Sequence, residues 1–178
     1  MRTEPRSGCP INAAVETLGD PWNVVVLRDV MFGDRRYFRE LLTGSEEGIA
    51  SNVLAARLKA LVAGGLLTRE DAGRGRRARY SLTEAGIATL PVLVALGTWG
   101  REHRDTTREL TVRQELLEAG GPEMLAELMD ELRAAHLGAD LPPSHRPRAG
   151  ERLQAAYEEA VRCGAPLAGG SPATGGRR

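Results

Sequence analysis

"SNVLAARLKALVAGGLLTREDAGRGRRARYSLT", residues 51–83, changes its hydrophobic period halfway along. In the first half, leucines recur at the three- and four-residue spacing of an amphipathic helix, and Gly64-Gly65 ends the pattern. In the second half, "LLTRED" and "RARYSL" are short runs compatible with strands, and "AGRG" between them is typical of a hairpin turn. The stretch therefore predicts a helix followed by a β-hairpin with an arginine-rich tip.

The segments on either side predict further helices. Upstream, "CPINAAVETLG" and "WNVVVLRDVMFG" show helical spacing, and "YFRELL" predicts a short helix. Downstream, Thr83 is placed to cap a helix, which Pro91 should kink or split before "VLVALGTWGREH". Helices, a hairpin and a further helix in this order predict a mainly α chain with a small β-hairpin, arranged as a winged helix-turn-helix domain.

Beyond about residue 105 the composition changes. Six of the seven aromatic residues lie in the first 99 positions, so we expect the main core there. "PEMLAELMDELRAAHLG" predicts an amphipathic helix, "LPPSHRPRAG" a linker and "ERLQAAYEEAVRCG" a weaker helix. The last residues, rich in Gly, Pro, Ala and Ser, are typical of a disordered tail. We therefore predict a winged helix-turn-helix domain at 9–104, a helical C-terminal extension at 105–163 and a disordered tail at 164–178.

The charge is balanced overall but not along the chain. The sequence contains 24 basic and 24 acidic residues, and residues 1–104 hold 15 of the basic against 12 of the acidic ones. All the basic residues except Lys59 are arginines, whose planar guanidinium suits phosphate and guanine. This local basic surplus favours a nucleic-acid partner, although an arginine-rich composition is equally typical of a GC-rich genome.

The turn at residues 73–79 has three interpretations. Gly73–Ala78 matches the dinucleotide-binding pattern G-x-G-x-x-A, but that pattern requires a helix directly after it, and the next residues alternate like a strand. A solvated charged loop is the usual interpretation of a charge run. The position immediately after a helix of the predicted domain instead favours a wing on the DNA backbone or minor groove. The predicted wing residues are Arg74, Arg76, Arg77 and Arg79.

The helix that precedes the wing can be divided into faces. At about 100° per residue, the face opposite its leucines carries Asn52, Ala56 and Lys59, with Val53 at the edge. Asn52 can pair bidentately with adenine, Val53 can contact a thymine methyl, and Lys59 suits phosphate. Ser51 is equally suited to DNA contact and to capping the helix, whereas for Asn52 we favour contact. The predicted major-groove residues are Ser51, Asn52, Val53, Ala56 and Lys59.

The segments "CPINAAVETLGDPWNVVVLRDVMFG", "YFRELL", "GIASNVLAARLKALVAGGLL" and "RYSLTEAG…LPVLVALGTWGREH" carry a recognisable set of motifs. With their Cys-Pro start, R-L-K-x-L, Y-x-L-T and P-V-L…W-G, they resemble the HxlR-type winged-helix transcriptional regulators from about Cys9 to His103. The resemblance implies a homodimer that binds a pseudo-palindromic double-stranded DNA operator and regulates transcription, here expected as a repressor. Ala50 departs from the serine often found there, and the resemblance implies nothing about the role of residues 105–178.

The expected dimer interface consists of the first helix and the helix around Val92–Trp99. Its apolar residues outnumber what one small winged-helix domain can cover. The residues expected at the interface are Val15, Leu18, Leu93 and Leu96.

Cys9 is the most chemically suggestive residue. It precedes Pro10 at a helix start, where unpaired N–H groups and the positive helix end favour the thiolate. Some similar regulators use this cysteine to sense oxidants or electrophiles, which makes Cys9 a candidate redox sensor and an oxidant or small molecule a candidate effector. Alternatively, Cys9 is a small residue packed at the dimer interface. Cys163 could act as a resolving partner, although an incidental position in a weak helix is the simpler interpretation.

Other function classes have little support in the sequence. No Ser/His/Asp set indicates catalysis, and the cysteines and histidines lack metal-ligand spacing, so we expect no enzyme, no metal and no cofactor. His103, His136 and His145 are expected on the surface. No apolar run is long enough to span a bilayer, and a signal-peptide core is missing, which indicates a cytoplasmic protein without a membrane partner. The alternative function is a winged-helix protein-interaction module without sequence-specific DNA binding.

Overall fold

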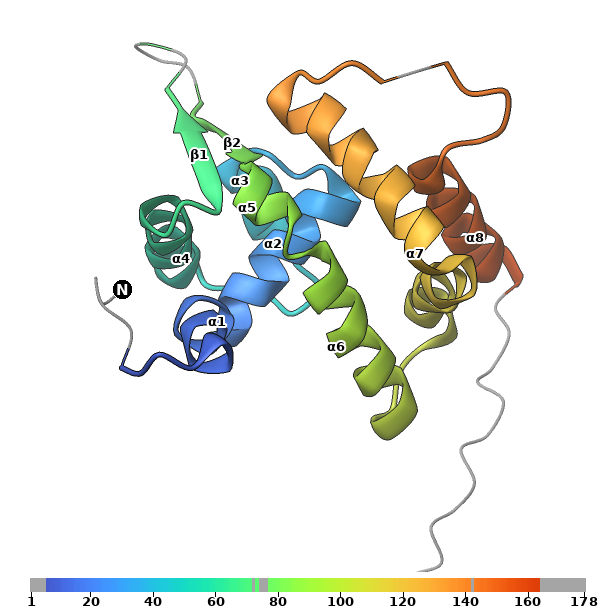
Figure 1. Ribbon diagram of the computed structural model, residues 1–178, viewed down its shortest axis with the longest axis horizontal. Coiled ribbons are helices and arrows are strands. Elements are labelled where there is room, and N and C mark those ends of the chain that lie inside the picture. The colour runs from blue at the N-terminus through green and yellow to red at the C-terminus, as the bar shows by residue number, and fades with distance from the viewer. Residues whose placement is uncertain (1–5, 72, 74–76, 142, 164–178) are drawn as a thin grey trace, which may run out of the picture.

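The computed structural model describes residues 6–71, 73, 77–141 and 143–163 (Figure 1). Four helices form its N-terminal part, and local signals set where two of them begin. Pro10 and Pro21 occupy first turns, where a missing N–H costs no hydrogen bond. The Asp20 carboxylate accepts a hydrogen bond from the N–H of Trp22 at 3.0 Å. These helices are α1 (Pro10–Leu18), α2 (Pro21–Gly33), α3 (Phe38–Gly44) and α4 (Ser51–Ala63).

The predicted β-hairpin is confirmed. β1 (Leu67–Glu70) and β2 (Arg79–Leu82) pair antiparallel, with Leu67 opposite Leu82. The chain ahead of α3 adds to the other edge of β2, because the N–H of Tyr80 donates to the carbonyl of Arg36 at 2.8 Å. β2 therefore lies between β1 and the segment that leads into α3.

The capping role of Thr83 and the split before Pro91 are also confirmed. The Thr83 hydroxyl accepts a hydrogen bond from the N–H of Gly86 at 3.0 Å and starts α5 (Glu84–Ile87). A second helix, α6 (Leu90–His103), then begins with Pro91 in its first turn.

The core lies between α2, α4, the hairpin and the start of α6. On α4, Leu54, Leu58 and Leu61 are at most 1% exposed, as their spacing predicts. They pack in one cluster of buried apolar side chains with residues of α2, the hairpin, α5 and α6. The members on those elements include Val26, Leu27, Val30, Leu67, Leu82, Ile87 and Leu90.

The C-terminal extension contains more helix than its sequence pattern predicts. Its two helices are α7 (Arg108–Leu137) and α8 (Ala149–Cys163). α7 bends at Gly121, whose φ of 56° is a backbone conformation that glycine adopts more readily than other residues. Only the part of α7 after the bend was expected. The first half was missed because two consecutive glycines interrupt the helical pattern, although the seven-residue spacing of Leu110 and Leu117 was an available signal.

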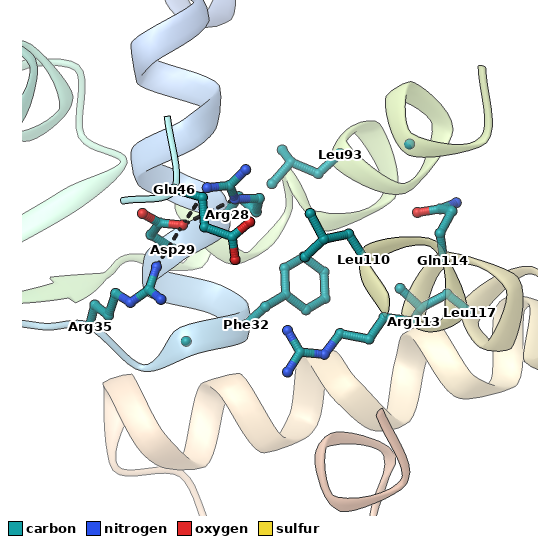
Figure 2. A pocket seen from close by; sticks show the side chains of 12 residues that line it. Arg28, Asp29, Phe32, Arg35, Glu46, Leu93, Leu110, Arg113, Gln114 and Leu117 are labelled. Atoms are coloured by element: carbon teal, nitrogen blue, oxygen red, sulfur yellow. Dashed lines mark hydrogen bonds and ion pairs between the residues drawn. The ribbon is translucent and has the colours of Figure 1, made fainter. Parts of the chain in front are cut away.

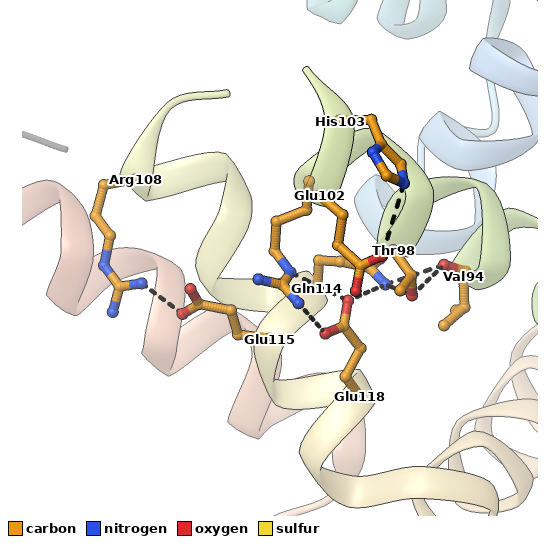
Figure 3. Close-up of polar contacts among 9 residues, drawn as sticks. Val94, Thr98, Glu102, His103, Arg108, Gln114, Glu115 and Glu118 are labelled. Carbon is orange, nitrogen blue, oxygen red and sulfur yellow. Dashed lines mark hydrogen bonds and ion pairs between the residues drawn. The ribbon is translucent and has the colours of Figure 1, made fainter. Parts of the chain in front are cut away.

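The first half of α7 packs on α6 through a polar seam (Figure 3). Gln114 Nε2 donates to the carbonyl of Val94 at 3.0 Å and to the Thr98 hydroxyl at 2.9 Å. A Cβ on Gly97 would lie 2.2 Å from the Gln114 side-chain oxygen, so a larger residue there would displace this amide from its present position. The seam fixes the extension to the winged-helix domain.

The second half of α7 covers the hairpin. Arg36, only 5% exposed, donates to the carbonyl of Tyr80 at 3.3 Å and to that of Ala135 at 2.9 Å. Arg133 forms an ion pair with Glu84 at 2.6 Å, which lowers the pKa of that carboxyl. The C-terminal extension therefore contacts both the wing and the helix that follows it.

The expectation that all three histidines lie on the surface is wrong for His136. His103 and His145 are exposed, but His136 is half-buried, and its Nδ1 accepts a hydrogen bond from the N–H of Leu82 at 3.2 Å. Burial, followed by the charges of Arg36 and Arg79, lowers its pKa to about 4. The error arises because α7 folds back over the hairpin, which no local pattern reveals.

Candidate nucleic-acid interface

Two ion pairs hold the helix-turn-helix pair, α3 and α4, against α2. In the turn between α3 and α4, Glu47 receives two hydrogen bonds from Arg28, at 2.5 and 2.8 Å, and these lower the pKa of Glu47. On α4, Arg57 donates to Asp20 at 2.7 Å, the same carboxylate that caps α2. Because both pairs end on α2, they orient α4 relative to the core.

The outward face of α4 carries the side chains that the sequence places there. Ser51, Asn52, Ala56 and Lys59 are exposed, whereas Val53 is partly buried. The buried leucines occupy the opposite face, so the helix presents one side to the core and the other to solvent. Four of the five predicted major-groove residues are therefore accessible to a ligand.

The capping interpretation of Ser51 does not hold. Ala50 occupies the N-cap position of α4 and supplies no side-chain hydrogen bond. Within the described residues, the side chains of Ser51 and Asn52 have no intramolecular hydrogen bond, and Lys59 has no ion pair. Their polar atoms are available for contacts outside the chain.

The wing residues fall into two groups. Arg77 is exposed, and no carboxylate in the described part of the chain pairs with it; Arg79 is partly buried at the start of β2, opposite Glu70. Arg74 and Arg76 lie outside the described residues. Figure 1 shows the hairpin and α4 on the side of the molecule away from α8.

Two exposed positions near α4 were missed by the sequence analysis. Ala55 lies next to Ala56 on the solvent side, where a small side chain permits close approach. Arg39 on α3 is exposed and has no ion pair with any described residue. The signal for Arg39 was its place in the helix before the turn, since the first helix of such a pair crosses the DNA backbone.

The structure places Cys9 and Cys163 on different sides of the molecule. Cys9 is the exposed N-cap residue of α1, and Cys163 is the exposed last residue of α8. Figure 1 shows these two helices far apart. The Cys163 thiol donates to Glu159 at 3.1 Å, and this contact raises the pKa of Cys163. The arrangement gives no support to Cys163 as a resolving partner within one chain.

The expected dimer surface is exposed on α1 and α6, with one correction. Leu93 is only 8% exposed and packs inside the chain, because it lies on the α6 face turned toward α7. Leu18 is partly buried. The large apolar side chains that remain exposed on the two helices are Ile11, Val15, Val92, Leu96 and Trp99.

Comparison with known proteins agrees with this geometry. The family described as HxlR-like helix-turn-helix matches residues 17–108, just over half of the chain. The chain belongs to this family. The matched segment contains α2 to α6 and ends where α7 begins, so the contacts of the C-terminal extension lie beyond it.

Several relatives of this HxlR-like chain are described as HTH-type transcriptional regulators. An uncharacterized HTH-type transcriptional regulator of Mycobacterium tuberculosis is 34% identical over 97 residues, covering 54% of this chain and 60% of that protein. Another, from Synechocystis, is 33% identical over 95 residues, covering 53% of this chain and 69% of that protein. The chain thus spans about 60% of the length of its mycobacterial relatives. By their descriptions, both relatives are transcriptional regulators.

A solved structure shares the fold. The crystal structure of PA1607, described as a candidate transcription factor, aligns with a TM-score of 0.51 and 34% identity. The alignment covers 57% of this chain and 69% of the PA1607 chain.

Among the helices in the described part of our chain, none combines the length and apolar character needed to cross a membrane.

Proposed function

We propose that this HxlR-like protein is a homodimeric transcriptional repressor that acts on DNA in the cytoplasm. The observation that carries the proposal is the outward face of α4. Its polar side chains, Asn52 and Lys59, are exposed and have no partner in the described residues, while Arg28 and Arg57 are used to hold the helix-turn-helix pair in place. A helix fixed in this way presents its polar groups with little loss of conformational freedom on binding.

The proposed contacts divide between reading and positioning. α4 enters the major groove, where Asn52 contacts a base edge and Ser51, Val53 and Ala56 lie against the groove. Lys59, with Arg77 and Arg79 on the wing side, contacts phosphates or the minor groove, and we assign the same role to Arg74 and Arg76. Arg39 of α3 contributes a further backbone contact.

Dimerisation through α1 and α6 completes the proposed regulator. Exposed apolar side chains on both helices need cover, and a two-fold axis through them would bring two copies of α4 into one dimer. Such a dimer recognises two half-sites separated by about 34–36 Å, one helical turn, or by a multiple of it.

Cys9 is proposed as the redox-responsive residue of this dimer. It is exposed at the start of α1, two residues from Ile11, whose side chain is 73% exposed. Oxidation at this position adds bulk and polarity where the two subunits would meet. The spacing of the two reading helices would then change, and with it the affinity for the operator.

Two measurements of DNA binding test the proposal, a footprint and a salt titration. In the footprint we expect two protected half-sites on the DNA around the gene that encodes the protein. The logarithm of the affinity should fall linearly with the logarithm of the salt concentration. If duplex DNA is bound without sequence preference while a protein partner is bound independently of salt, the interaction-module alternative is correct and the proposal fails.

A further inference from the structure

A cavity of about 280 Å³ lies where the winged-helix domain meets the C-terminal extension (Figure 2). α2, the loop after α3, α6 and the first half of α7 each contribute to its wall. The volume is just below the range of about 300–1,000 Å³ for small-molecule sites in proteins, so only a small ligand would fit. The cavity is separate from the outward face of α4 and from the exposed apolar face of α6.

One part of the wall is apolar and comes from three helices. Phe32 of α2, Leu93 of α6 and Leu117 of α7 line it, and Leu93 and Leu117 are 8% and 3% exposed. Leu110 of α7 is 46% exposed and forms the edge toward solvent. Figure 2 shows the Phe32 ring next to the guanidinium of Arg113, with Leu110 on the other side of the ring. This wall suits the hydrocarbon part of a ligand.

The charged part of the wall contains one carboxylate that is fully engaged. Asp29, 5% exposed, pairs with Arg28 at 2.8 Å and with Arg35 at 3.1 Å. Arg28 also binds Glu47, as described above. The second carboxylate at the cavity, Glu46, is exposed in the loop after α3 and forms no ion pair with a described residue.

Arg113 differs from the other two arginines at the cavity. Its guanidinium donates to Gln154 at 2.7 Å and lies 4.2 Å from the centre of the Tyr157 ring, but it pairs with no carboxylate in the described residues. Burial lowers the pKa of Arg113. A guanidinium carries five N–H donors, so most of its capacity remains unused.

We propose that the cavity binds a small organic monocarboxylate, with its carboxylate on Arg113 and its hydrocarbon body against Phe32, Leu93 and Leu117. Of the three arginines at the cavity, Arg28 and Arg35 pair with carboxylates, and Arg113 is the one without an ion pair among the described residues. A carboxylate accepts two parallel hydrogen bonds from a guanidinium, which supplies both affinity and orientation. A polyphosphate would need further unpaired cations, which this wall does not offer.

The occupied cavity would join α2, which supports α4, to α7 of the extension. An effect of the ligand on operator affinity follows only if the proposed function is correct. The binding itself is independent of that function, so the test uses the full-length protein without DNA.

Calorimetric titration with phenylacetate and with its neutral counterpart phenylacetamide tests the site. We expect one saturable phenylacetate site per chain and at least tenfold weaker binding of the amide. Arg113→Gln should weaken phenylacetate binding at least tenfold and leave the amide unchanged, while Arg108→Gln, on the same helix but outside the cavity, should change neither. Leu110→Trp, at the solvent edge, should fill the cavity and weaken both ligands.

Several results would overturn the proposal. One is that neither phenylacetate nor hexanoate, an aliphatic monocarboxylate, binds saturably up to about 10 mM. Any dissociation constant would then exceed this concentration, which means very weak affinity. Another is equal binding of acid and amide, or an equal loss in the Arg108→Gln and Arg113→Gln variants. Because Leu110 is partly exposed, its variant should fold even if Arg113→Gln does not, and unchanged binding in Leu110→Trp would place the ligand elsewhere.

Discussion

The basic side chains divide into two groups according to their intramolecular partners. Arg28 and Arg57 bind carboxylates and fix the position of α4. Lys59 and Arg77 are exposed and have no ion pair within the described residues. The first group determines where α4 lies, and the second is available to the phosphates of the proposed DNA partner. Net charge, which is zero for this chain, does not reveal this division.

Asn52 and Lys59 allow the two roles to be separated. Lys59→Ala should weaken binding to all duplexes equally and reduce the salt slope by about one unit, because one phosphate contact is lost. Asn52→Ala should cost about 1–3 kcal/mol on the operator and relax the preference at one base pair. Fluorescence anisotropy on operator and scrambled duplexes measures both, with Arg162→Ala on α8 as the control. A loss of specific and nonspecific binding in the same ratio for both variants would contradict the assignment.

The redox role of Cys9 also belongs to a single residue. Cys9→Ser should bind operator as tightly as the wild type under reducing conditions, since the side chain makes no cap hydrogen bond to α1. After peroxide or diamide the wild type should lose affinity and the variant should not. Cys163→Ser is the matched control and should behave like the wild type. If mass spectrometry shows Cys9 oxidised while operator affinity is unchanged, Cys9 has a packing role and does not sense oxidants.

Among the elements, those with local signals were predictable. The leucine spacing of α4, the strand pattern of the hairpin and the effects of Thr83 and Pro91 each act within a few residues, and these predictions are confirmed for the described residues. The first half of α7 was missed because its glycines interrupt the pattern. The cavity was not predictable, because four parts of the chain must meet to form it. The position of His136 was not predictable either, because it depends on the packing of α7 against the distant strand β2.

The contact between α7 and β2 should make stability depend on pH. His136 accepts a hydrogen bond at Nδ1, so it must be neutral there, and its pKa is lowered to about 4 in the folded chain. Its contribution to stability is complete above the unfolded pKa of about 6.5 and declines as the pH falls toward 4, because the unfolded chain binds the proton more readily. Urea unfolding between pH 7 and pH 5 should show this decline.

His136→Gln isolates the effect. Glutamine can accept the same hydrogen bond but does not titrate, so the variant should lose less stability than the wild type between pH 7 and pH 5. The carboxyls with a lowered pKa, such as Glu47 and Glu84, act only below about 4.5 and do not interfere. An identical decline in both proteins would show that His136 is not responsible.

For the whole molecule, α6 has two apolar faces with different roles. One face, with Leu93 and Gly97, meets α7 and the cavity. The other carries Val92, Leu96 and Trp99, which are 44%, 50% and 52% exposed. The C-terminal extension therefore covers one side of α6 and leaves the second open. α1 adds Ile11 and Val15 to the uncovered apolar surface.

This uncovered surface predicts a homodimer that charges on α1 and α6 should dissociate. Val15→Glu combined with Leu96→Glu would bring four carboxylates into a two-fold interface and remove four apolar side chains from it. Light scattering should show a dimer for the wild type and a monomer for the double variant at the same micromolar concentration. Leu137→Glu, at the end of α7, is the control, because Leu137 is 46% exposed but lies on neither helix.

The monomeric variant should keep weak nonspecific DNA binding and lose most of its operator affinity, since one half-site contributes far less than two on one rigid dimer. A monomeric wild type, or dissociation by Leu137→Glu alone, would place the interface elsewhere.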